Sequence, residues 1–289
     1  MEQAYQHLIV TRMHGLLFVT LNRPETRNAL GAEVVAEMDR AITGSPGEPP
    51  PRAVILRGSG GFFSAGGNIG GFAARADQPT AQPDPVAARN REFGRFLQRL
   101  AALSMPVVAA VEGAAMGGGM GLACAADIVL ATRDARFALS ETRLGLIPAQ
   151  IAPFVVARLG LRVTRRLGIS GERIHGDLAL QLGLADELAA DSASLDALLA
   201  RWLTAICACA PRANALIKPL LAECASPPTD AGDTLDRAAA LFSRCLRDEG
   251  AAGVEAFRKR QPPGWVETIA AEDVRKACAG LPPPPVSIP

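Results

Sequence analysis

Residues 109–148 read AAVEGAAMGGGMGLACAADIVLATRDARFALSETRLGLIP, with three consecutive glycines close to the start. An apolar run at 106–111 leads into the glycines and predicts a buried strand. The residues at 120–126 are mostly small and compatible with a helix, and a second apolar run follows at 128–131. The order strand, glycine turn, helix, strand predicts an α/β fold around this stretch.

The glycine triplet predicts a place where backbone N–H groups face a ligand. Glycine takes positive φ without steric cost, so Gly117, Gly118 and Gly119 let the chain turn with its amides exposed. Because the predicted helix begins here, these amides lie at a helix N-terminus, which favours negative charge. The sequence therefore predicts a site for an anion, or for negative charge that develops during a reaction.

Other parts of the first half fit the same fold class. Apolar runs at 16–21 and 53–56 predict two further strands. Apolar residues between these runs recur at helical spacing: Leu30, Val34, Val35, Met38 and Ile42. A strand, a helix and a second strand in this order predict parallel pairing of the two strands. A loop is predicted at 44–51, which ends in three consecutive prolines.

The second half is dominated by helical patterns. They cover 153–159, 177–182, 194–206, 214–221, 230–246 and 253–259. A polar, proline-spotted stretch at 76–85 predicts a mobile or lid-like segment. Four consecutive prolines at 282–285 predict a disordered or polyproline II tail.

Charge and cysteine content argue against several classes of function. With 30 Lys and Arg against 29 Asp and Glu, the formal net charge is +1, so no global field favours nucleic acid or an anionic membrane. The six cysteines form no CxxC pair and the three histidines are scattered, so we expect no metal site. No signal-like N-terminus and no run of about 20 apolar residues occurs, so we expect a reduced, cytoplasmic protein with no membrane partner.

Three blocks of the sequence resemble the signature of the crotonase (enoyl-CoA hydratase/isomerase) superfamily. They are LNRPETRNAL at 21–30, GFFSAGGN at 61–68 and the glycine-rich stretch at 109–148, in the family's order. The resemblance runs from about His7 to the region of Trp265.

This resemblance implies a fold and a division of the chain. The fold is an α/β crotonase-like spiral of ββα repeats with a helical C-terminal part that mediates trimerisation. The expected parts are a spiral core with the CoA and acyl site at 1–200, a helical region at 201–265 and a proline-rich tail at 266–289. Relatives commonly form trimers or dimers of trimers, so we expect a homotrimer or a hexamer.

The resemblance also implies an oxyanion hole formed by the backbone amides of Gly67 and Gly118. A thioester carbonyl becomes an enolate when its α-carbon loses a proton or a nucleophile adds at its β-carbon, and fixed N–H donors stabilise that charge. Asn68 stands where the family usually has an aspartate. An asparagine also forms local hydrogen bonds, so Asn68 remains among the expected substrate contacts.

The acid/base group implied by the resemblance is Glu141. Family hydratases typically use two glutamates that together hold a water molecule. In this sequence the first position is Gly121, expected to line the substrate site, and the second is Glu141. An apolar acyl pocket raises the pKa of a glutamate towards neutrality, which suits a group that takes and gives a proton. Glu112 is a weaker candidate, because its position more often serves structure.

A single glutamate leaves two reactions open. Δ3,Δ2-enoyl-CoA isomerases of the superfamily move a proton between C2 and C4 with one glutamate that matches Glu141. However, SETRLGLIPAQIAPFV at 140–155 is similar to a hydratase branch that acts on branched glutaconyl-CoA esters, including the 3-methylglutaconyl-CoA and isohexenylglutaconyl-CoA hydratases. We expect hydration across C2=C3 of such an ester, with the second proton handled by water or a substrate carboxylate, and keep the isomerase as the alternative.

Contacts to coenzyme A are expected at blocks that the family uses for this purpose. The expected residues are Arg27, Asn28, Ala29, Ala65 and Lys259, the last of them often from a neighbouring subunit. The second carboxylate of a glutaconyl group needs a cation or several donors, and Gln150, Arg143 and Arg75 are the first candidates. Coenzyme A belongs to the acyl-CoA substrate, so no separate cofactor is expected.

Two other classes of protein remain open at this point. A non-catalytic acyl-CoA-binding relative would keep the glycine donors, and so would a CoA thioesterase or decarboxylase on the same scaffold. Product analysis separates them: hydration gives a hydroxyacyl-CoA, isomerisation preserves mass, hydrolysis releases CoA and a binder changes nothing. A dinucleotide-binding motif is not completed at 58–63, and a GxSxG elbow is absent from the sequence.

Overall fold

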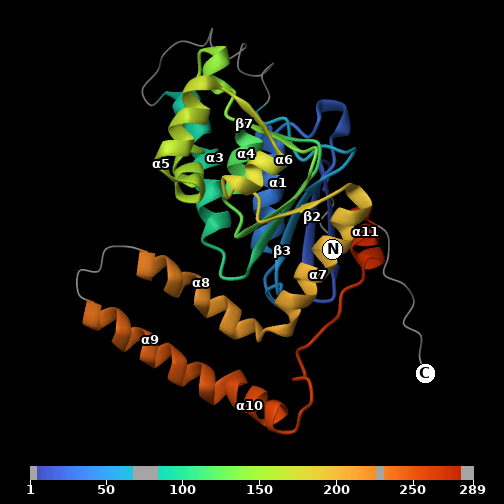
Figure 1. The fold of residues 1–289 in the computed structure, drawn as a ribbon, viewed down its shortest axis with the longest axis vertical. Helices are drawn as coiled ribbons and strands as arrows, with labels where there is room; N and C mark the ends of the chain where they lie inside the picture. The colour runs from blue at the N-terminus through green and yellow to red at the C-terminus, as the bar shows by residue number, and fades with distance from the viewer. Residues whose placement is uncertain (1–4, 68–83, 226–230, 281–289) are drawn as a thin grey trace.

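The computed structural model describes residues 5–67, 84–225 and 231–280 of the 289-residue chain (Figure 1). Its larger sheet has the strand order β1-β2-β3-β4-β6-β9. The bounds are β1 Leu8–Met13, β2 Leu16–Leu21, β3 Val54–Gly58, β4 Val107–Val111, β6 Ile128–Thr132 and β9 Glu187–Ala189. Only the β1–β2 pair is antiparallel among these described strands, and the other neighbours run parallel.

The strand–helix–strand unit predicted at the start of the chain is confirmed. Helix α1 (Ala32–Thr43) joins β2 to β3, and these strands pair in parallel from Leu17 opposite Val54 to Leu21 opposite Gly58. The four apolar runs predicted as strands correspond to β2, β3, β4 and β6. The loop predicted at 44–51 contains neither a helix nor a strand.

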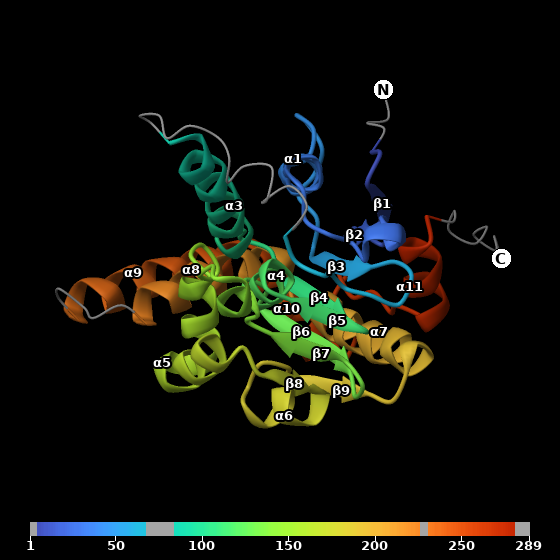
Figure 2. The same ribbon diagram turned by 90° about the horizontal axis from the view of Figure 1, so that it is seen from above.

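Helices cover both faces of the larger sheet (Figure 2). Every residue of β2 is buried, with its alternate residues in two different apolar clusters. The first cluster includes residues of α1, α3 (Pro85–Ala101), α4 (Gly118–Cys124) and α5 (Ala152–Ser170). The second includes residues of α7 (Ser192–Ala208) and α11 (Ala271–Cys278). A parallel strand buried on both faces is expected to be apolar along its whole length, as β2 is.

A second, three-stranded sheet has the order β5-β7-β8. Its strands are β5 Ala114–Met116, β7 Arg136–Ala138 and β8 Arg173–His175, and α6 (Gly176–Gln181) follows β8. Strand β5 ends at the glycine triplet, and the parallel strand β7 ends three residues before Glu141. The small sheet therefore brings these two segments to the same edge.

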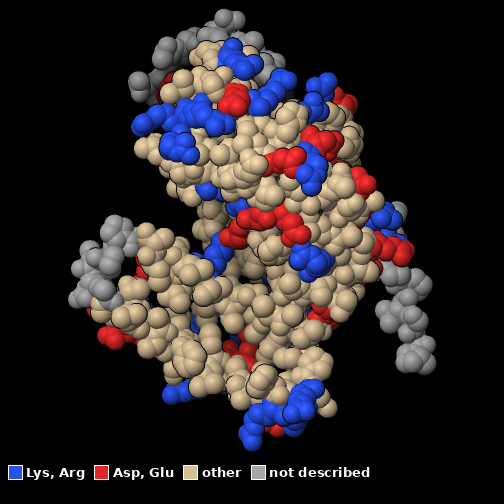
Figure 3. All heavy atoms as spheres, in the orientation of Figure 1, with Lys and Arg blue, Asp and Glu red and all other residues tan. Residues whose placement is uncertain are grey.

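The C-terminal arm, residues 211–258, extends away from the sheets (Figure 1). It contains α8 (Pro211–Ala225), α9 (Ala231–Cys245), a π-helical segment η3 (Leu246–Gly250) and α10 (Ala251–Arg258). No side chain is buried in α8 or α10, and large apolar side chains are exposed along the arm: Leu221, Leu235, Phe242 and Phe257. In the space-filling view the arm presents a largely uncharged surface (Figure 3).

The C-terminal end differs from the tail predicted at 266–289. Residues 271–278 form α11, whose Val274, Ala277 and Cys278 are buried against the sheet. These side chains share one helical face because they are spaced by three and four residues. The predicted core boundary at residue 200 falls inside α7, so the core continues to the end of that helix.

Two sequence expectations lie outside the described residues. They are the predicted lid-like segment, apart from its last two residues, and the proline run at 282–285. Of the part that is described, Asp84 caps α3 by accepting a hydrogen bond from the amide of Val86, and Pro85 is the first residue of that helix.

No single described helix is long and apolar enough to cross a membrane, although α7 and α8, bent by 97° at their junction, pass that test as a pair.

Candidate functional site

Two glycine loops touch backbone to backbone at the start of α4. Ser64 pairs with Ala115 in an isolated bridge, and the amide of Met116 donates to the carbonyl of Ser64 at 3.0 Å. A methyl group placed on Gly66 would lie 2.4 Å from the Met116 carbonyl oxygen and 3.3 Å from the Gly118 amide nitrogen. Only a residue without a side chain fits there, so Gly66 allows the segment carrying Gly67 to approach the one carrying Gly118.

The amides of Gly67 and Gly118 remain available in this arrangement. Gly118 is the first residue of α4, and its N–H therefore has no acceptor within the helix. Among the described residues, no acceptor takes the N–H of Gly67 or of Gly118. The structure thus brings together the loops of the two predicted oxyanion donors, with both amides unpaired within the described part of the chain.

Glu141 lies against the same turn. It begins the short 3₁₀ helix η2 (Glu141–Leu144), and its Oε1 is 2.6 Å from the place that a methyl on Gly117 would occupy. Its Oε2 is buried and has no hydrogen-bond partner among the described residues. Desolvation raises the pKa of Glu141, although a hydrogen bond from its own backbone amide opposes the shift. An acidic side chain with a raised pKa therefore stands beside the glycine donors.

Apolar side chains line the other side of Gly118. A methyl placed there would lie 3.5 Å from Leu30 and 3.5 Å from the ring of Phe93 on α3. Such neighbours suit an acyl chain better than a polar group. Leu30 was predicted as the first residue of a helical pattern, but in the structure it precedes α1 and pairs with Gly67 in an isolated bridge. Phe93 was not predicted, and its helical spacing with Phe96 and Leu100 was the available signal.

Gly121 faces a side chain rather than open space. The Ile151 Cγ2 atom lies 2.2 Å from the position of a Cβ on Gly121, and Ile151 is buried at the N-cap of α5. The preceding residue, Gln150, lies against α3, with Oε1 2.0 Å from the corresponding position on Gly94. Gly121 was expected to line the substrate site, and in the structure it gives room to Ile151.

The block at Arg27–Ala29 folds back on the first glycine loop. Arg27 and Asn28 both have positive φ, at 52° and 55°. Arg27 lies over the ring of Phe62, and its carbonyl accepts from the amide of Ala65 at 2.8 Å. The exposed Arg27 guanidinium and the partly exposed Ala29 and Ala65 lie at the surface, where a ligand could reach them.

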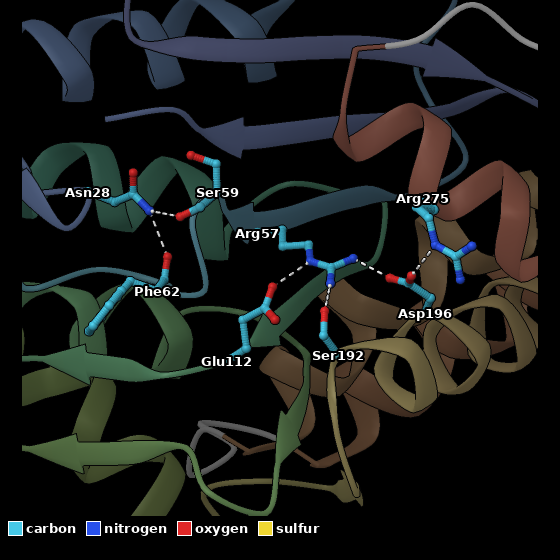
Figure 4. A network of polar contacts seen from close by, with 8 residues as sticks. All are labelled: Asn28, Arg57, Ser59, Phe62, Glu112, Ser192, Asp196 and Arg275. Atoms are coloured by element: carbon cyan, nitrogen blue, oxygen red, sulfur yellow. Dashed lines mark hydrogen bonds and ion pairs between the residues drawn. The ribbon is translucent and has the colours of Figure 1, made fainter. Parts of the chain in front are cut away.

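Asn28 has a different place from the one expected of a ligand contact. It is 1% exposed, its Oδ1 accepts from the amide of Arg23, and its Nδ2 donates to the carbonyls of Ser59 and Phe62 (Figure 4). These bonds use the acceptor and both donors of the side chain. Asn28 therefore holds the loops of this region together, and any contact of its side chain with coenzyme A would require breaking them.

Glu112 belongs to a buried ionic network around Arg57 (Figure 4). Arg57 donates to Glu112 at 3.1 Å, to Asp196 at 2.5 Å and to Ser192 at 3.1 Å. Arg275 donates to the second oxygen of Asp196 at 3.1 Å. The network connects β3, α7 and α11, so the structure gives Glu112 a structural role.

The remaining predicted residues lie against the end of α5, at the end of the C-terminal arm or outside the described residues. Arg143 is exposed and packs along Gly171, with its Nε 2.8 Å from the position of a Cβ there. Lys259 follows α10 at the end of the C-terminal arm, and its Nζ pairs with Glu255 at 3.1 Å. Figure 1 shows α10 far from α4 within one chain. Asn68 and Arg75 fall among the residues that the structure does not describe.

The site can also be compared with known proteins. The enoyl-CoA hydratase/isomerase family profile matches residues 11–268. Carnitinyl-CoA dehydratase of Citrobacter koseri is 31% identical over 90% of this chain and 98% of its own length. 2,3-Dehydroadipyl-CoA hydratase of Escherichia coli is 31% identical over 63% of this chain and 68% of its own length.

Solved structures indicate the same family as these relatives. The crystal structure of an enoyl-CoA hydratase/isomerase from Marinobacter aquaeolei is 40% identical, with a TM-score of 0.85 over 91% of this chain and 100% of its own. The expected crotonase-type α/β fold with a helical C-terminal part is thus confirmed. Because the family profile matches most of the chain and the solved structure is 40% identical to it, the chain belongs to the enoyl-CoA hydratase/isomerase family.

Proposed function

We propose that this protein adds water across the C2=C3 bond of an enoyl-CoA thioester. The observation that carries the proposal is the Glu141 carboxylate, with one buried oxygen, beside the amides of the glycine loops; within the described residues neither that oxygen nor those amides have a hydrogen-bond partner. The hydratase named among its relatives supports the reaction class. In this proposal Gly67 and Gly118 bind the thioester oxygen, and Glu141 handles the proton.

The amides stabilise the charge that develops on the thioester oxygen. When water adds at C3, the electron pair of C2=C3 moves towards C1 and the thioester becomes an enolate. An N–H donor fixed at that oxygen stabilises the transition state by roughly 3–4 kcal/mol. Two donors from separate loops hold the oxygen in one position, which is the arrangement we propose for Gly67 and Gly118.

Glu141 supplies the acid/base chemistry. As the water oxygen bonds to C3, one water proton passes to the Glu141 carboxylate; the protonated Glu141 then gives a proton to C2, and the enolate returns to a thioester. Glu141 is regenerated, and one proton passes from water through Glu141 to C2; this route replaces the expectation that water or a substrate carboxylate handles the second proton. A raised pKa suits the first step, because it makes the Glu141 carboxylate a stronger base towards the water proton.

We propose a branched, glutaconyl-type acyl group that carries a second carboxylate. The likeness of residues 140–155 to the hydratases of such esters motivates this choice. A relative named for 2,3-dehydroadipyl-CoA, also a dicarboxylic acyl group, is compatible with it. Gln150, at the α3 side of the site, is the donor we would assign to that carboxylate, with Arg143 and Arg75 as further candidates.

Isomerisation is the second candidate, and a specific observation favours it. Ile151 fills the space in front of Gly121, so Glu141 is the acid that the described residues place beside the donors. A single glutamate that takes a proton from C4 and returns it to C2 would use the same amides without any added water. The two reactions differ in product mass.

For coenzyme A, we propose contacts from Arg27, Ala29 and Ala65 on one protomer and from Lys259 on a neighbouring one. Lys259 is the C-cap of α10, which lies far from α4 within one chain (Figure 1), so the neighbouring protomer is the source that would bring it near the site. The exposed apolar side chains of the C-terminal arm support a homotrimer or a dimer of trimers, because such a surface is expected to be covered.

Incubation with a panel of enoyl-CoA esters tests the function. The panel should include 3-methylglutaconyl-CoA, isohexenylglutaconyl-CoA, 2,3-dehydroadipyl-CoA and a straight-chain ester without the second carboxylate. A product heavier by one water, formed faster from the dicarboxylic esters, is the expected result. Unchanged mass with a moved double bond would establish the isomerase, and release of free CoA or no product at all would contradict both reactions.

A further inference from the structure

Two buried glycines on neighbouring helices receive two consecutive residues. Gly94 of α3 receives the side chain of Gln150, and Gly121 of α4 receives that of Ile151. For Gly121 the overlap involves two atoms: a Cβ would lie 2.2 Å from Ile151 Cγ2 and 2.5 Å from Ile151 Cβ, but 3.5 Å from its Cα. The start of α5 is therefore fixed between α3 and α4 by these two contacts.

Ile151 and Glu141 lie against adjacent turns at the start of α4. The amide of Gly121 donates to the carbonyl of Gly117 at 3.0 Å, so the two glycines are one helical turn apart. Glu141 fills the space in front of Gly117, and Ile151 fills the space in front of Gly121. The aliphatic side chain of Ile151 has no donor or acceptor, so it offers no hydrogen bond to a water molecule at this place.

We propose that Ile151 is a specificity-determining residue: it closes the space in front of Gly121 to a second acid and to bulk water, while the reacting water reaches Glu141 from the side of the glycine amides, and so confines proton transfer to one carboxylate. The chemical part of this inference, the confinement of proton transfer to Glu141, rests on the proposed function. The geometric part, the overlap of Ile151 with Gly121 and the shielding of Glu141, does not, because both can be measured without a substrate.

Melting temperatures of paired variants test the geometric part. Gly121→Ala should melt about 5 °C lower than the wild type, because the new methyl overlaps Ile151. The loss should persist in an Ile151→Ala background, where the Cβ at 2.5 Å remains, and disappear in an Ile151→Gly background, where the nearest atom is 3.5 Å away. Gly168→Ala is the matched control, because its nearest neighbour is Leu139 at 3.8 Å; it should not lower the melting temperature.

The shielding of Glu141 by Ile151 is tested by the pH dependence of stability in variants of both residues. Replacing Glu141 by Gln should raise the melting temperature more at neutral than at acidic pH, because burial disfavours the ionised carboxylate. Ile151→Gly should diminish that pH-dependent gain by admitting water, whereas Ile151→Val should keep it. With the substrate identified by the panel, the acidic limb of the pH–rate profile should move to lower pH in Ile151→Gly and stay in place in Ile151→Val.

The outcomes separate this inference from the proposed function. A Gly121→Ala variant as stable as the wild type, or a loss that is equal in all backgrounds, would overturn the assignment of Ile151. An unchanged pH dependence in Ile151→Gly would overturn the shielding. If no ester of the panel reacts while the melting results hold, the hydratase proposal fails and the placement of Ile151 beside Glu141 stands.

Discussion

At the scale of single residues, Glu141 is held in a place that disfavours its charge. Its Oε2 is buried without a partner among the described residues, and its Oε1 faces the backbone turn at Gly117. A carboxylate with a buried, unpartnered oxygen destabilises the fold when it is ionised. Such a destabilised group beside free amides is typical of a reactive site rather than of a structural one.

The pH dependence of stability follows from this burial. Because folding raises the pKa of Glu141, the folded state binds more protons than the unfolded state between the two pKa values. The contribution of Glu141 to stability is thus most favourable below the unfolded pKa and is lost as pH rises through the folded pKa. We expect Glu141→Gln to be more stable than the wild type at neutral pH and equal to it at acidic pH, as measured by urea unfolding. Glu25→Gln, an exposed glutamate, is the control; a Glu141→Gln variant less stable at neutral pH would contradict the assignment.

The role of a residue could be predicted from the sequence only where the residue lies within a local pattern or within a block that resembles the family signature. The glycine triplet and Glu141 were identified because they lie within one stretch that resembles a family signature. Ile151 was not, because its contact with Gly121 joins positions 30 residues apart through packing that no local pattern reports. The buried hydrogen bonds of Asn28 likewise depend on loops that meet only in the folded chain.

At the scale of elements, the site depends on the contact between the loop at 64–67 and the start of α4. Gly66 and Gly61 both have positive φ, 86° and 73°, but a methyl on Gly66 meets backbone atoms, whereas one on Gly61 meets nothing within 4 Å. An alanine would be strained by the positive φ at either position, but only at position 66 would its methyl group also clash with backbone atoms.

We therefore expect Gly66→Ala to reduce kcat by about 100-fold or more, because it separates the two amides that stabilise one oxygen. Gly61→Ala should reduce stability slightly and leave kcat per folded molecule unchanged. Steady-state kinetics and circular dichroism on both variants check the expectation. Equal kcat in the two variants would mean that the close approach of the loops has no part in catalysis.

The Arg57 network ties three elements together. Arg57 is 7% exposed and contacts carboxylates from two directions, whereas the Arg99–Asp39 pair is at the surface. Removing one partner of a buried ion pair leaves an uncompensated charge, so Arg57→Ala should lower the free energy of unfolding by about 3–5 kcal/mol. Arg99→Ala should lower it by about 0–1 kcal/mol. Chemical denaturation of both variants measures this, and a loss for Arg57→Ala no larger than that for Arg99→Ala would contradict the stabilising role.

Elements were predictable to the extent that their apolar pattern was continuous. Most residues of β2, β3, β4 and β6 are apolar and consecutive, and all four strands were predicted. Strands β5, β7, β8 and β9 have three residues each, too few to show a period. Helix α11 was missed because its three buried side chains make a short stripe close to the prolines of the tail.

At the scale of the whole molecule, the C-terminal arm carries large apolar side chains that one chain leaves exposed. Phe242 and Phe257 are 70% and 83% exposed. We expect sedimentation to give three or six chains, and Phe242→Asp with Phe257→Asp to dissociate them, because two charges would be desolvated in the interface. Leu180→Asp, outside the arm, should leave the assembly intact. A wild-type protein that sediments as a single chain at all concentrations would contradict the role of the arm.

In the proposed function, one carboxylate and two backbone amides carry out the conversion of an enoyl-CoA ester. The most direct test of this function is the turnover of the wild type and of Glu141→Gln on the best ester of the panel, with product mass recorded. We predict a product heavier by one water from the wild type and a kcat at least about 100-fold lower for Glu141→Gln, with the fold intact. Near-normal turnover by Glu141→Gln would remove this residue from the mechanism and contradict the account.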